Sequence, residues 1–183
     1  MVTFLMIARV LYDKGFQQYV DAAKIIKRNY NDTRFWLLGD IDEQYPNHVP
    51  LEVVEECDRE GIIDYLGYSE NVIEIMKDVD CIIHPSYYNE GMSRVLMEAL
   101  ALRKPIITTT IPGCKEFVVN EMNGFLCEPK SVESLVQAID SFLGLNVIQR
   151  KEMGEYGRNI AESKFNIENV KTIYHRVIGN YLK

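Results

Sequence analysis

The chain has 183 residues, of which 47% are hydrophobic and 26% are charged, and its formal net charge is −7. This length and composition indicate one globular domain with a substantial core. The negative charge, with no basic stripe along the chain, excludes nucleic acid as the expected partner, and any anionic ligand would need a local positive site.

Short apolar runs alternate along the chain with amphipathic stretches. The runs are rich in β-branched and aromatic residues, and several are apolar on both faces, which is typical of buried parallel strands. We expect strands at residues 3–8, 34–38, 62–66, 81–84, 105–108 and 124–127. We expect helices at residues 16–29, 51–60, 71–78 and 94–102, and a short one at 115–120. The alternation predicts an α/β fold, a Rossmann-like doubly wound parallel sheet of about six strands.

The pattern changes after residue 127, where the apolar runs stop and only helical stretches follow. Helices are expected at residues 131–143, with Ser131 as the N-cap, and then at 147–164 and 167–181. The last one carries an apolar stripe at helical spacing, made of Val170, Ile173, Tyr174, Val177, Ile178 and Tyr181. Such a stripe usually packs in the core, but at the end of a chain it also suits a partner domain. We therefore expect one domain over residues 1–183, whose terminal helices, 146–183, pack on another domain.

The cysteines and acidic residues give no sign of a metal centre. Cys57, Cys81, Cys114 and Cys127 are widely spaced, which favours buried reduced thiols over zinc ligands or disulfides. Asp78 and Asp80 form an Asp-x-Asp pattern, but it precedes a buried strand, so it is expected at the amino end of the sheet. His84 is interpreted as a structural residue, and Cys114 has no neighbouring base to activate it. No run of about 18 apolar residues occurs, and the cytoplasm is the expected location.

Two cations follow the first predicted strand. Arg9 and Lys14 lie in the segment ARVLYDKG, directly before a helix that starts after Gly15. An arginine fork and a lysine point charge beside a helix N-terminus suit two phosphate groups. The alternative is a solvated loop with incidental charges.

A pair of glutamates follows the fourth predicted strand. Glu90 and Glu98 flank seven residues in the segment EGMSRVLME, with Gly91 after the first and Ser93 as a candidate N-cap. Unpaired amides at the start of this helix would bind an anion, and the two carboxylates would bracket it. A nucleotide-sugar has hydroxyls on both sides of a diphosphate and matches this layout. The alternative is two acids that merely favour a helix start.

Other strand ends carry further candidates. Gly39 follows the second strand and would permit either close approach of a ligand or a tight turn. Tyr68 and Ser69 follow the third strand, where they would present a ring and backbone groups to a base or only begin a helix. In open α/β sheets, ligands bind beyond the carboxyl ends of the strands, so these residues are expected to share one crevice.

The motifs at these strand ends, taken in order, resemble a known family. The matching segments are RVLYDKG, WLLGD, LGYSENVIEIMKDVDCIIHPSYYNEGMSRVLMEALALRKPIITTTIPGCKEFV and NGFLCEP. They resemble the nucleotide-binding C-terminal half of retaining GT-B glycosyltransferases of family 4, also called glycosyltransferase group 1. The run PGCKE followed by NGFLCEP resembles the sequence of members that build bacterial capsule or lipopolysaccharide.

The resemblance implies a role for each matching residue. Arg9 and Lys14 hold the donor diphosphate and stabilise the leaving group. Glu90 holds the donor sugar, while Gly91, Met92 and Ser93 offer backbone amides to sugar and phosphate. Glu98 binds the ribose, and the loop around Tyr68 adjoins the base. Ala8 and Met92 depart from the family pattern, which has a glycine and commonly an aromatic residue there.

The resemblance also implies the activity. The full-length protein is expected to be a hexosyltransferase that uses UDP-, GDP- or a similar nucleotide-sugar, with retention and without a bound metal. The acceptor, a sugar or a lipid-linked saccharide, would bind an N-terminal domain. The apolar run directly after Met1 suggests that this domain precedes the present chain, which alone is expected to be inactive. The full-length enzyme is expected in the cytoplasm, with possible peripheral association at the inner face of the membrane. The alternatives are half of a GT-B sugar-nucleotide 2-epimerase and a non-catalytic module that binds a nucleotide-sugar or a partner.

Overall fold

A parallel sheet of six strands forms the centre of the computed structural model, which describes residues 1–89 and 91–181. The strand order is β3-β2-β1-β4-β5-β6. The strands are β1 (Val2–Ile7), β2 (Thr33–Leu38), β3 (Asp64–Tyr65), β4 (Cys81–His84), β5 (Ile106–Thr109) and β6 (Gly124–Cys127). Every strand pair is parallel. The expected doubly wound α/β fold is therefore confirmed.

Helices connect the strands and extend the chain beyond the last one. The α-helices are α1 (Phe16–Asn29), α2 (Leu51–Arg59), α3 (Val72–Lys77), α4 (Arg94–Ala101), α5 (Val132–Leu143), α6 (Val147–Lys164) and α7 (Ile167–Tyr181). Two 3-10 helices, η1 (Tyr12–Lys14) and η2 (Lys115–Phe117), lie in loops that follow strands. The sequence pattern did not indicate η1. The expected helix at residues 115–120 is confined to η2.

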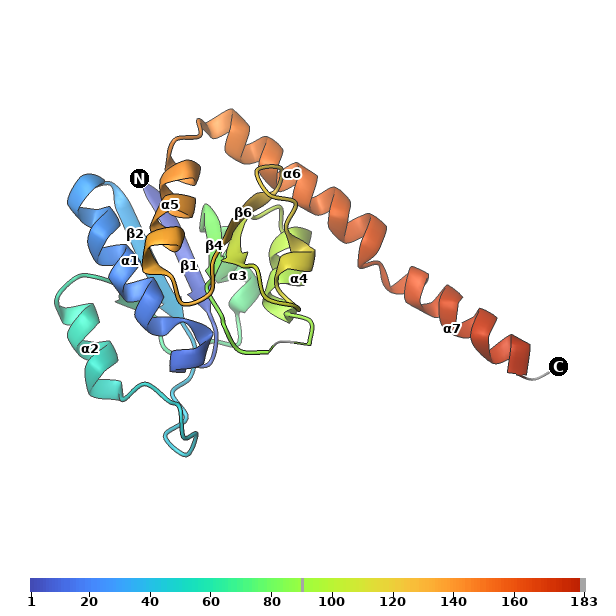
Figure 1. Cartoon of the computed structure of the whole chain (residues 1–183), viewed down its shortest axis with the longest axis horizontal. Coiled ribbons are helices and arrows are strands. Elements are labelled where there is room, and N and C mark those ends of the chain that lie inside the picture. The colour runs from blue at the N-terminus through green and yellow to red at the C-terminus, as the bar shows by residue number, and fades with distance from the viewer. Residues whose placement is uncertain (90, 182–183) are drawn as a thin grey trace.

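Helices cover both faces of the sheet (Figure 1), and the core forms two layers, one on each face. Successive side chains of a strand point to opposite faces, so Phe4 and Met6 of β1 pack with α1, α2 and α5. Leu5 and Ile7 pack on the other face with α3, α4 and α6. This is why the buried strands read as continuous apolar runs. All four cysteines are buried and free, as expected.

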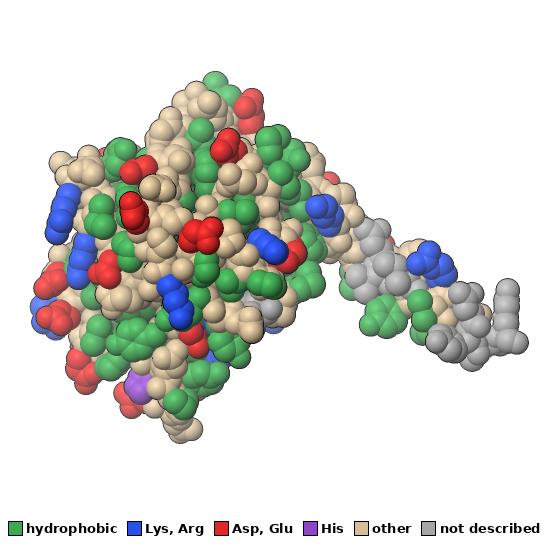
Figure 2. Space-filling view, viewed as in Figure 1, with side chains coloured by type: hydrophobic (Ala, Val, Ile, Leu, Met, Phe, Trp, Pro, Cys, Tyr) green, Lys and Arg blue, Asp and Glu red, His purple; other side chains and the backbone are tan. Residues whose placement is uncertain are grey.

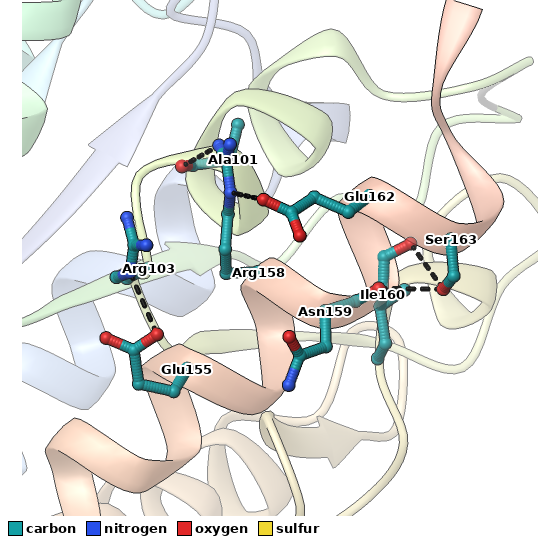
Figure 3. Close-up of polar contacts among 8 residues, drawn as sticks. All are labelled: Ala101, Arg103, Glu155, Arg158, Asn159, Ile160, Glu162 and Ser163. Atoms are coloured by element: carbon teal, nitrogen blue, oxygen red, sulfur yellow. Dashed lines mark hydrogen bonds and ion pairs between the residues drawn. The ribbon is translucent and has the colours of Figure 1, made fainter. Parts of the chain in front are cut away.

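Helix α6 is fixed to α4 by contacts at the end of α4 (Figure 3). Arg158 donates to the carbonyl oxygen of Ala101 (2.8 Å), and Arg103 forms an ion pair with Glu155 (2.9 Å). A Cβ atom at Gly154 would overlap the carbonyl oxygen of Arg103, so the two backbones touch. This close approach sets the direction in which α6 leaves the sheet.

Helix α7 continues beyond α6 and projects away from the sheet (Figure 1). Its side chains at Ile167, Tyr174, Val177 and Ile178 are exposed, and Tyr174 keeps 64% of its surface in solvent. Figure 2 shows hydrophobic side chains along this projecting arm. The side chains of Val170, Ile173 and Tyr181 lie outside the described part of the chain. No described helix combines the length and the apolar character that crossing a membrane requires.

Candidate functional site

The direction of strand order reverses between β1 and β4, which are neighbours at the centre of the sheet. In open α/β sheets, ligands bind at such a switch point, beyond the carboxyl ends of the strands. The segments that follow these two ends are residues 8–15, after β1, and residues 85–93, after β4. The region around these two segments is therefore the candidate functional site.

The two loops are bonded to each other through their backbones. The carbonyl oxygen of Asp13 accepts hydrogen bonds from the amides of Tyr87 (3.0 Å) and Tyr88 (3.1 Å). The hydroxyl of Ser86 donates to the same oxygen (3.4 Å). Gly15 packs directly against Pro85, where a Cβ atom would overlap the carbonyl oxygen of Pro85. The segment with the predicted cations thus has a fixed position relative to the segment after β4.

Both predicted cations lie in the segment after β1. Arg9 is exposed, and its guanidinium carbon lies 4.4 Å from the centre of the Tyr45 ring. Lys14 is half-buried, and its Nζ lies 4.5 Å from the centre of the Tyr88 ring. Helix α1 begins two residues after Lys14, so its N-terminus adds a positive field beside these charges. The cations give a local positive site on a chain with net negative charge.

Gly39 supports the strand ends by close packing. A Cβ atom there would overlap the carbonyl oxygen of Ala8, so glycine is required where the segment after β2 crosses the segment after β1. Its amide donates to Gly67 (2.9 Å), and its carbonyl accepts from the Tyr65 hydroxyl (3.0 Å). Contact with the protein's own backbone therefore accounts for the small residue at this position.

Tyr68 and Ser69 follow β3 at the far edge of the same set of loops. The Tyr68 side chain keeps 69% of its surface in solvent. The Ser69 hydroxyl accepts from the amide of Asn71 (3.0 Å) and so organises the start of α3. Because Gly67 is bonded to Gly39, this loop is tied to the one after β2. Tyr68 is free to meet a ligand, whereas Ser69 has a local structural role.

The segment before α4 forms one wall of a pocket of about 640 Å³. Gly91 and Met92 line it together with Pro112, Gly113 and Phe165. Ser93 occupies the N-cap position of α4 as predicted, but its hydroxyl makes no capping hydrogen bond. Its amide instead donates to the carbonyl of Gly113 (3.4 Å), which joins this segment to the loop after β5.

The two glutamates differ in what the structure shows of them. Glu90 lies outside the described residues. Glu98 lies on α4, with 32% of its side chain exposed, and its carboxylate is 3.7 Å from the guanidinium of Arg94. It lines a groove of about 460 Å³ between α4 and the end of α6, near Arg158 and Phe165. A weak, exposed ion pair of this kind leaves the carboxylate able to accept other hydrogen bonds.

The residues that the sequence analysis judged to be structural lie at the amino end of the sheet or inside the fold. Asp80 accepts from the amide of Thr3 (2.8 Å), which places the Asp-x-Asp segment at the amino end of β1, as expected. His84 is buried at the end of β4, and its carbonyl accepts from Thr108 (2.7 Å). Within residues 1–89 and 91–181, no cluster of three potential metal ligands occurs.

Sequence reasoning missed the tyrosine rings beside the two cations. Tyr45 lies in the loop after β2 and Tyr88 in the loop after β4. A third ring, that of Tyr87, lies 4.8 Å from Nζ of Lys130. The available signal was that all three aromatic residues follow strand ends, but their pairing with particular cations depends on the order of the strands.

Comparison with known proteins identifies a matching family and similar proteins. A family model described as "Glycosyl transferases group 1" matches residues 2–160. A relative in Campylobacter jejuni is 30% identical over 183 residues, which cover 96% of this chain and 45% of the relative. It is named N,N'-diacetylbacillosaminyl-diphospho-undecaprenol alpha-1,3-N-acetylgalactosaminyltransferase. The capsular polysaccharide biosynthesis glycosyltransferase CapM of Staphylococcus aureus is 22% identical, with coverage of 97% and 46%.

The fold is also found among solved structures. The crystal structure of Anabaena Alr3699/HepE in complex with UDP matches with a TM-score of 0.85 and 19% identity, over 97% of this chain and 48% of that one. At this identity the match supports the fold alone.

The chain spans about half the length of the curated relatives it matches.

Proposed function

The chain belongs to the glycosyl transferases group 1 family, and we propose that it is the donor-binding half of an enzyme that transfers a hexosyl group from a nucleoside-diphosphate-sugar with retention. Its sheet has the Rossmann-like arrangement found in GT-B glycosyltransferases. The observation that carries the proposal is the pair of cations, Arg9 and Lys14, beside the switch point of the sheet.

The two cations suit the diphosphate of the donor. Breaking the glycosidic bond leaves negative charge on the nucleoside diphosphate, and fixed positive charges stabilise that charge in the transition state. Arg9 supplies a planar fork of N–H donors and Lys14 a compact charge, so together they can contact both phosphates. Because these cations can supply the positive charge, we propose that the transfer needs no bound metal.

The remaining residues are assigned by their places around the two loops. We propose that Glu90 holds hydroxyls of the donor sugar and that the amides of Gly91, Met92 and Ser93 bind sugar and phosphate. The pocket beside Gly91 and Met92 supports this assignment, since it has room for a sugar ring. Glu98 would accept hydrogen bonds from the ribose.

The base would lie toward the loop after β3. The exposed ring of Tyr68 supports this placement. Ser69 would contribute backbone groups, since its hydroxyl is already bonded to the amide of Asn71. Gly39 would adjoin the donor and hold the loop that carries Tyr68, through the bond from its amide to Gly67.

The acceptor and the rest of the cleft are assigned to a second domain. The chain spans 45% of the Campylobacter relative, which supports an N-terminal half in the full-length protein. Within residues 146–183, the exposed apolar side chains of α7 support packing of that helix on the N-terminal half, whereas α6 packs on α4. The present chain would then bind the donor and transfer nothing by itself.

The relatives' names guide the choice of acceptor. The acceptor named for the Campylobacter relative carries diphospho-undecaprenol, and CapM is named for capsule synthesis. We propose a lipid-linked saccharide of a surface polysaccharide as the acceptor. The full-length enzyme would then work at the cytoplasmic surface of the membrane.

Calorimetric titration of the chain with UDP, GDP, ADP and their sugars tests the proposal. One of these ligands is expected to bind, and Arg9→Ala and Glu98→Gln are each expected to weaken it about tenfold or more, as for loss of a charge-assisted hydrogen bond. Lys151→Ala is the matched control, since Lys151 is an exposed cation on α6. A folded chain that binds none of these ligands would refute the donor-binding role.

A further inference from the structure

Each cation of the proposed donor site lies over a tyrosine ring. Arg9 is paired in this way with Tyr45 at 4.4 Å and Lys14 with Tyr88 at 4.5 Å. Both distances lie within the range in which a ring face attracts a cation. The rings come from different loops, so the two pairs are separate contacts around the segment after β1.

The backbone that carries the Tyr88 ring is bonded to the loop that carries Lys14. The amide of Tyr88 donates to the carbonyl of Asp13 (3.1 Å) and to the hydroxyl of Ser86 (3.3 Å). Asp13 directly precedes Lys14, so the ring and the lysine are carried by backbones that are bonded to each other. The backbones on the two sides of this cation–ring contact are thus joined by hydrogen bonds.

The loop that carries the Tyr45 ring is also fixed by backbone hydrogen bonds. The backbone carbonyl of Tyr45 accepts from the amide of His48 (3.0 Å), which closes the turn that carries the ring. The following residues are bonded to the segment after β1, since Val49 donates to Val10 (3.0 Å) and Tyr12 donates to Asn47 (3.0 Å). The ring thus belongs to a loop that is bonded to the segment directly after Arg9.

A ring contact leaves a cation able to bind phosphate. Arginine and lysine have long side chains whose freedom is lost when a ligand fixes them. A ring face restricts that freedom before binding and does not neutralise the charge as a carboxylate would. Guanidinium has five N–H donors and ammonium has three, so one such side chain can contact a ring and an anion at the same time.

We propose that Tyr45 and Tyr88 are positioning residues that hold Arg9 and Lys14 in the orientation that receives the donor diphosphate. This inference rests on the proposed function, because it takes the two cations to be the phosphate ligands. Neither tyrosine needs to touch the donor. Their effect is to reduce the ordering that binding requires.

Substitutions at Tyr88 test the inference by titration with UDP, GDP and inorganic pyrophosphate. Tyr88→Leu is expected to weaken binding of the diphosphates roughly 3- to 10-fold, because a long side chain that is no longer held beforehand must be ordered on binding. Tyr88→Phe keeps the ring face and is expected to bind within about twofold of the unchanged chain. Tyr87→Leu is the matched control, since that ring contacts Lys130 instead. The midpoints of urea unfolding show whether each variant is folded.

A double-mutant cycle separates positioning from a general effect on the loop. In a Lys14→Met background, Tyr88→Leu is expected to have no further effect on diphosphate affinity, because the residue it positions is gone. The same cycle applies to Tyr45→Leu and Arg9→Met. Uridine and guanosine have no phosphate, and their affinities are expected to be unchanged by either leucine variant.

The outcomes distinguish the proposed donor binding from the positioning role of the two tyrosines. Absence of diphosphate binding by the unchanged chain would overturn the proposed function and this inference together. Binding by the unchanged chain that Tyr88→Leu and Tyr45→Leu leave intact would overturn the inference alone. An equal loss in the Lys14→Met background, or an equal loss for the nucleosides, would also overturn it, since the ring would then act on the loop or on the base.

Discussion

Gly15 and Pro85 are in contact at the switch point of the sheet, and this contact joins the loop after β1 to the loop after β4. Gly15 has a φ of 88°, in the left-handed region, and ends η1 just before α1 begins. Only a residue without a Cβ atom satisfies both the backbone conformation and the contact. The geometry of the candidate phosphate site therefore depends on a glycine that bears no functional group.

Gly15→Ala is expected to lower the free energy of unfolding by about 2–5 kcal/mol, from the cost of positive φ together with overlap on Pro85. The measurement is urea denaturation followed by circular dichroism. Gly61→Ala is the matched control, because Gly61 has a φ of 66° with no atom near a Cβ position. That variant is expected to lose only about 1–2 kcal/mol. Equal losses in the two variants would contradict the contact.

Because the backbone of α6 touches the end of α4 at Gly154, alanine is expected to have opposite effects at Gly154 and at Gly179. In a helix, alanine is normally more stable than glycine by about 1 kcal/mol. At Gly154 a Cβ atom would overlap the carbonyl of Arg103, whereas at Gly179 in α7 no atom is near. Gly154→Ala is therefore expected to lower the unfolding free energy by about 1–3 kcal/mol. Gly179→Ala is expected to raise helix content or leave it unchanged, as circular dichroism would show.

The buried thiols predict a loss of stability in alkali. Burial raises the pKa of Cys127 from 9.0 to about 12. Burial also raises the pKa of Cys81 and of Tyr19 well above their ordinary values. A group whose pKa is raised by folding contributes stability that is complete below its pKa in the unfolded chain. That stability is lost as the pH rises toward its pKa in the folded chain. The window for Cys127 therefore runs from about pH 9 to about pH 12. Lys27 and Lys104, whose pKa values burial lowers, act in the opposite direction.

Because of Cys127, the free energy of unfolding is expected to fall by roughly 1.4 kcal/mol per pH unit once the thiol is ionised in the unfolded chain. Urea unfolding between pH 8 and 11, under reducing conditions, measures it. Cys127→Ala is expected to flatten the slope by about that amount. Cys57→Ala is the comparison, and its effect is expected to be smaller because its thiol is less deeply buried. A pH dependence that Cys127→Ala leaves unchanged would contradict the assignment.

The projecting helix α7 is expected to contribute little to the stability of the isolated chain. Ending the chain after Asn166 removes the exposed side chains of Ile167, Tyr174, Val177 and Ile178. The unfolding free energy is expected to change by less than about 0.5 kcal/mol, as for surface positions. Binding of the dye ANS, which reports exposed apolar surface, is expected to fall.

Ile160→Ala in α6 is the control for this truncation, because Ile160 is 7% exposed and packs in the layer of α4. It is expected to cost about 2–5 kcal/mol. A truncated chain that loses as much stability as this variant would show that α7 packs on the sheet domain itself.

Local patterns in the sequence predicted most element boundaries. The predicted bounds of β4, β6, α1, α6 and α7 coincide with the observed ones. The capping prediction holds for Ser131, whose hydroxyl accepts from the amide of Ser134 (3.1 Å). These features depend on hydrophobic periodicity and on residues a few positions apart, which the sequence displays directly.

Predictions that depended on distant partners were less accurate. The run at residues 62–66 forms only a short strand, Asp64–Tyr65, because its pairing with β2 is limited to two positions. Ser93 stands at the start of α4, yet its hydroxyl does not cap the helix, and its amide is bonded to Gly113 in another loop. In both cases the partner comes from elsewhere in the chain.

The sequence by itself determined the alternation of strands and helices, the placement of Arg9 and Lys14 after the end of one strand, and the placement of Glu98 on the helix that follows another. Those features follow from side-chain chemistry along a few consecutive residues. Only the tertiary structure decided that β4 lies beside β1, since strand order depends on how both faces of the sheet are covered. That adjacency places Tyr88 over Lys14 and makes Gly15 indispensable. The tyrosine rings thus acquired their expected role from the fold and not from any motif.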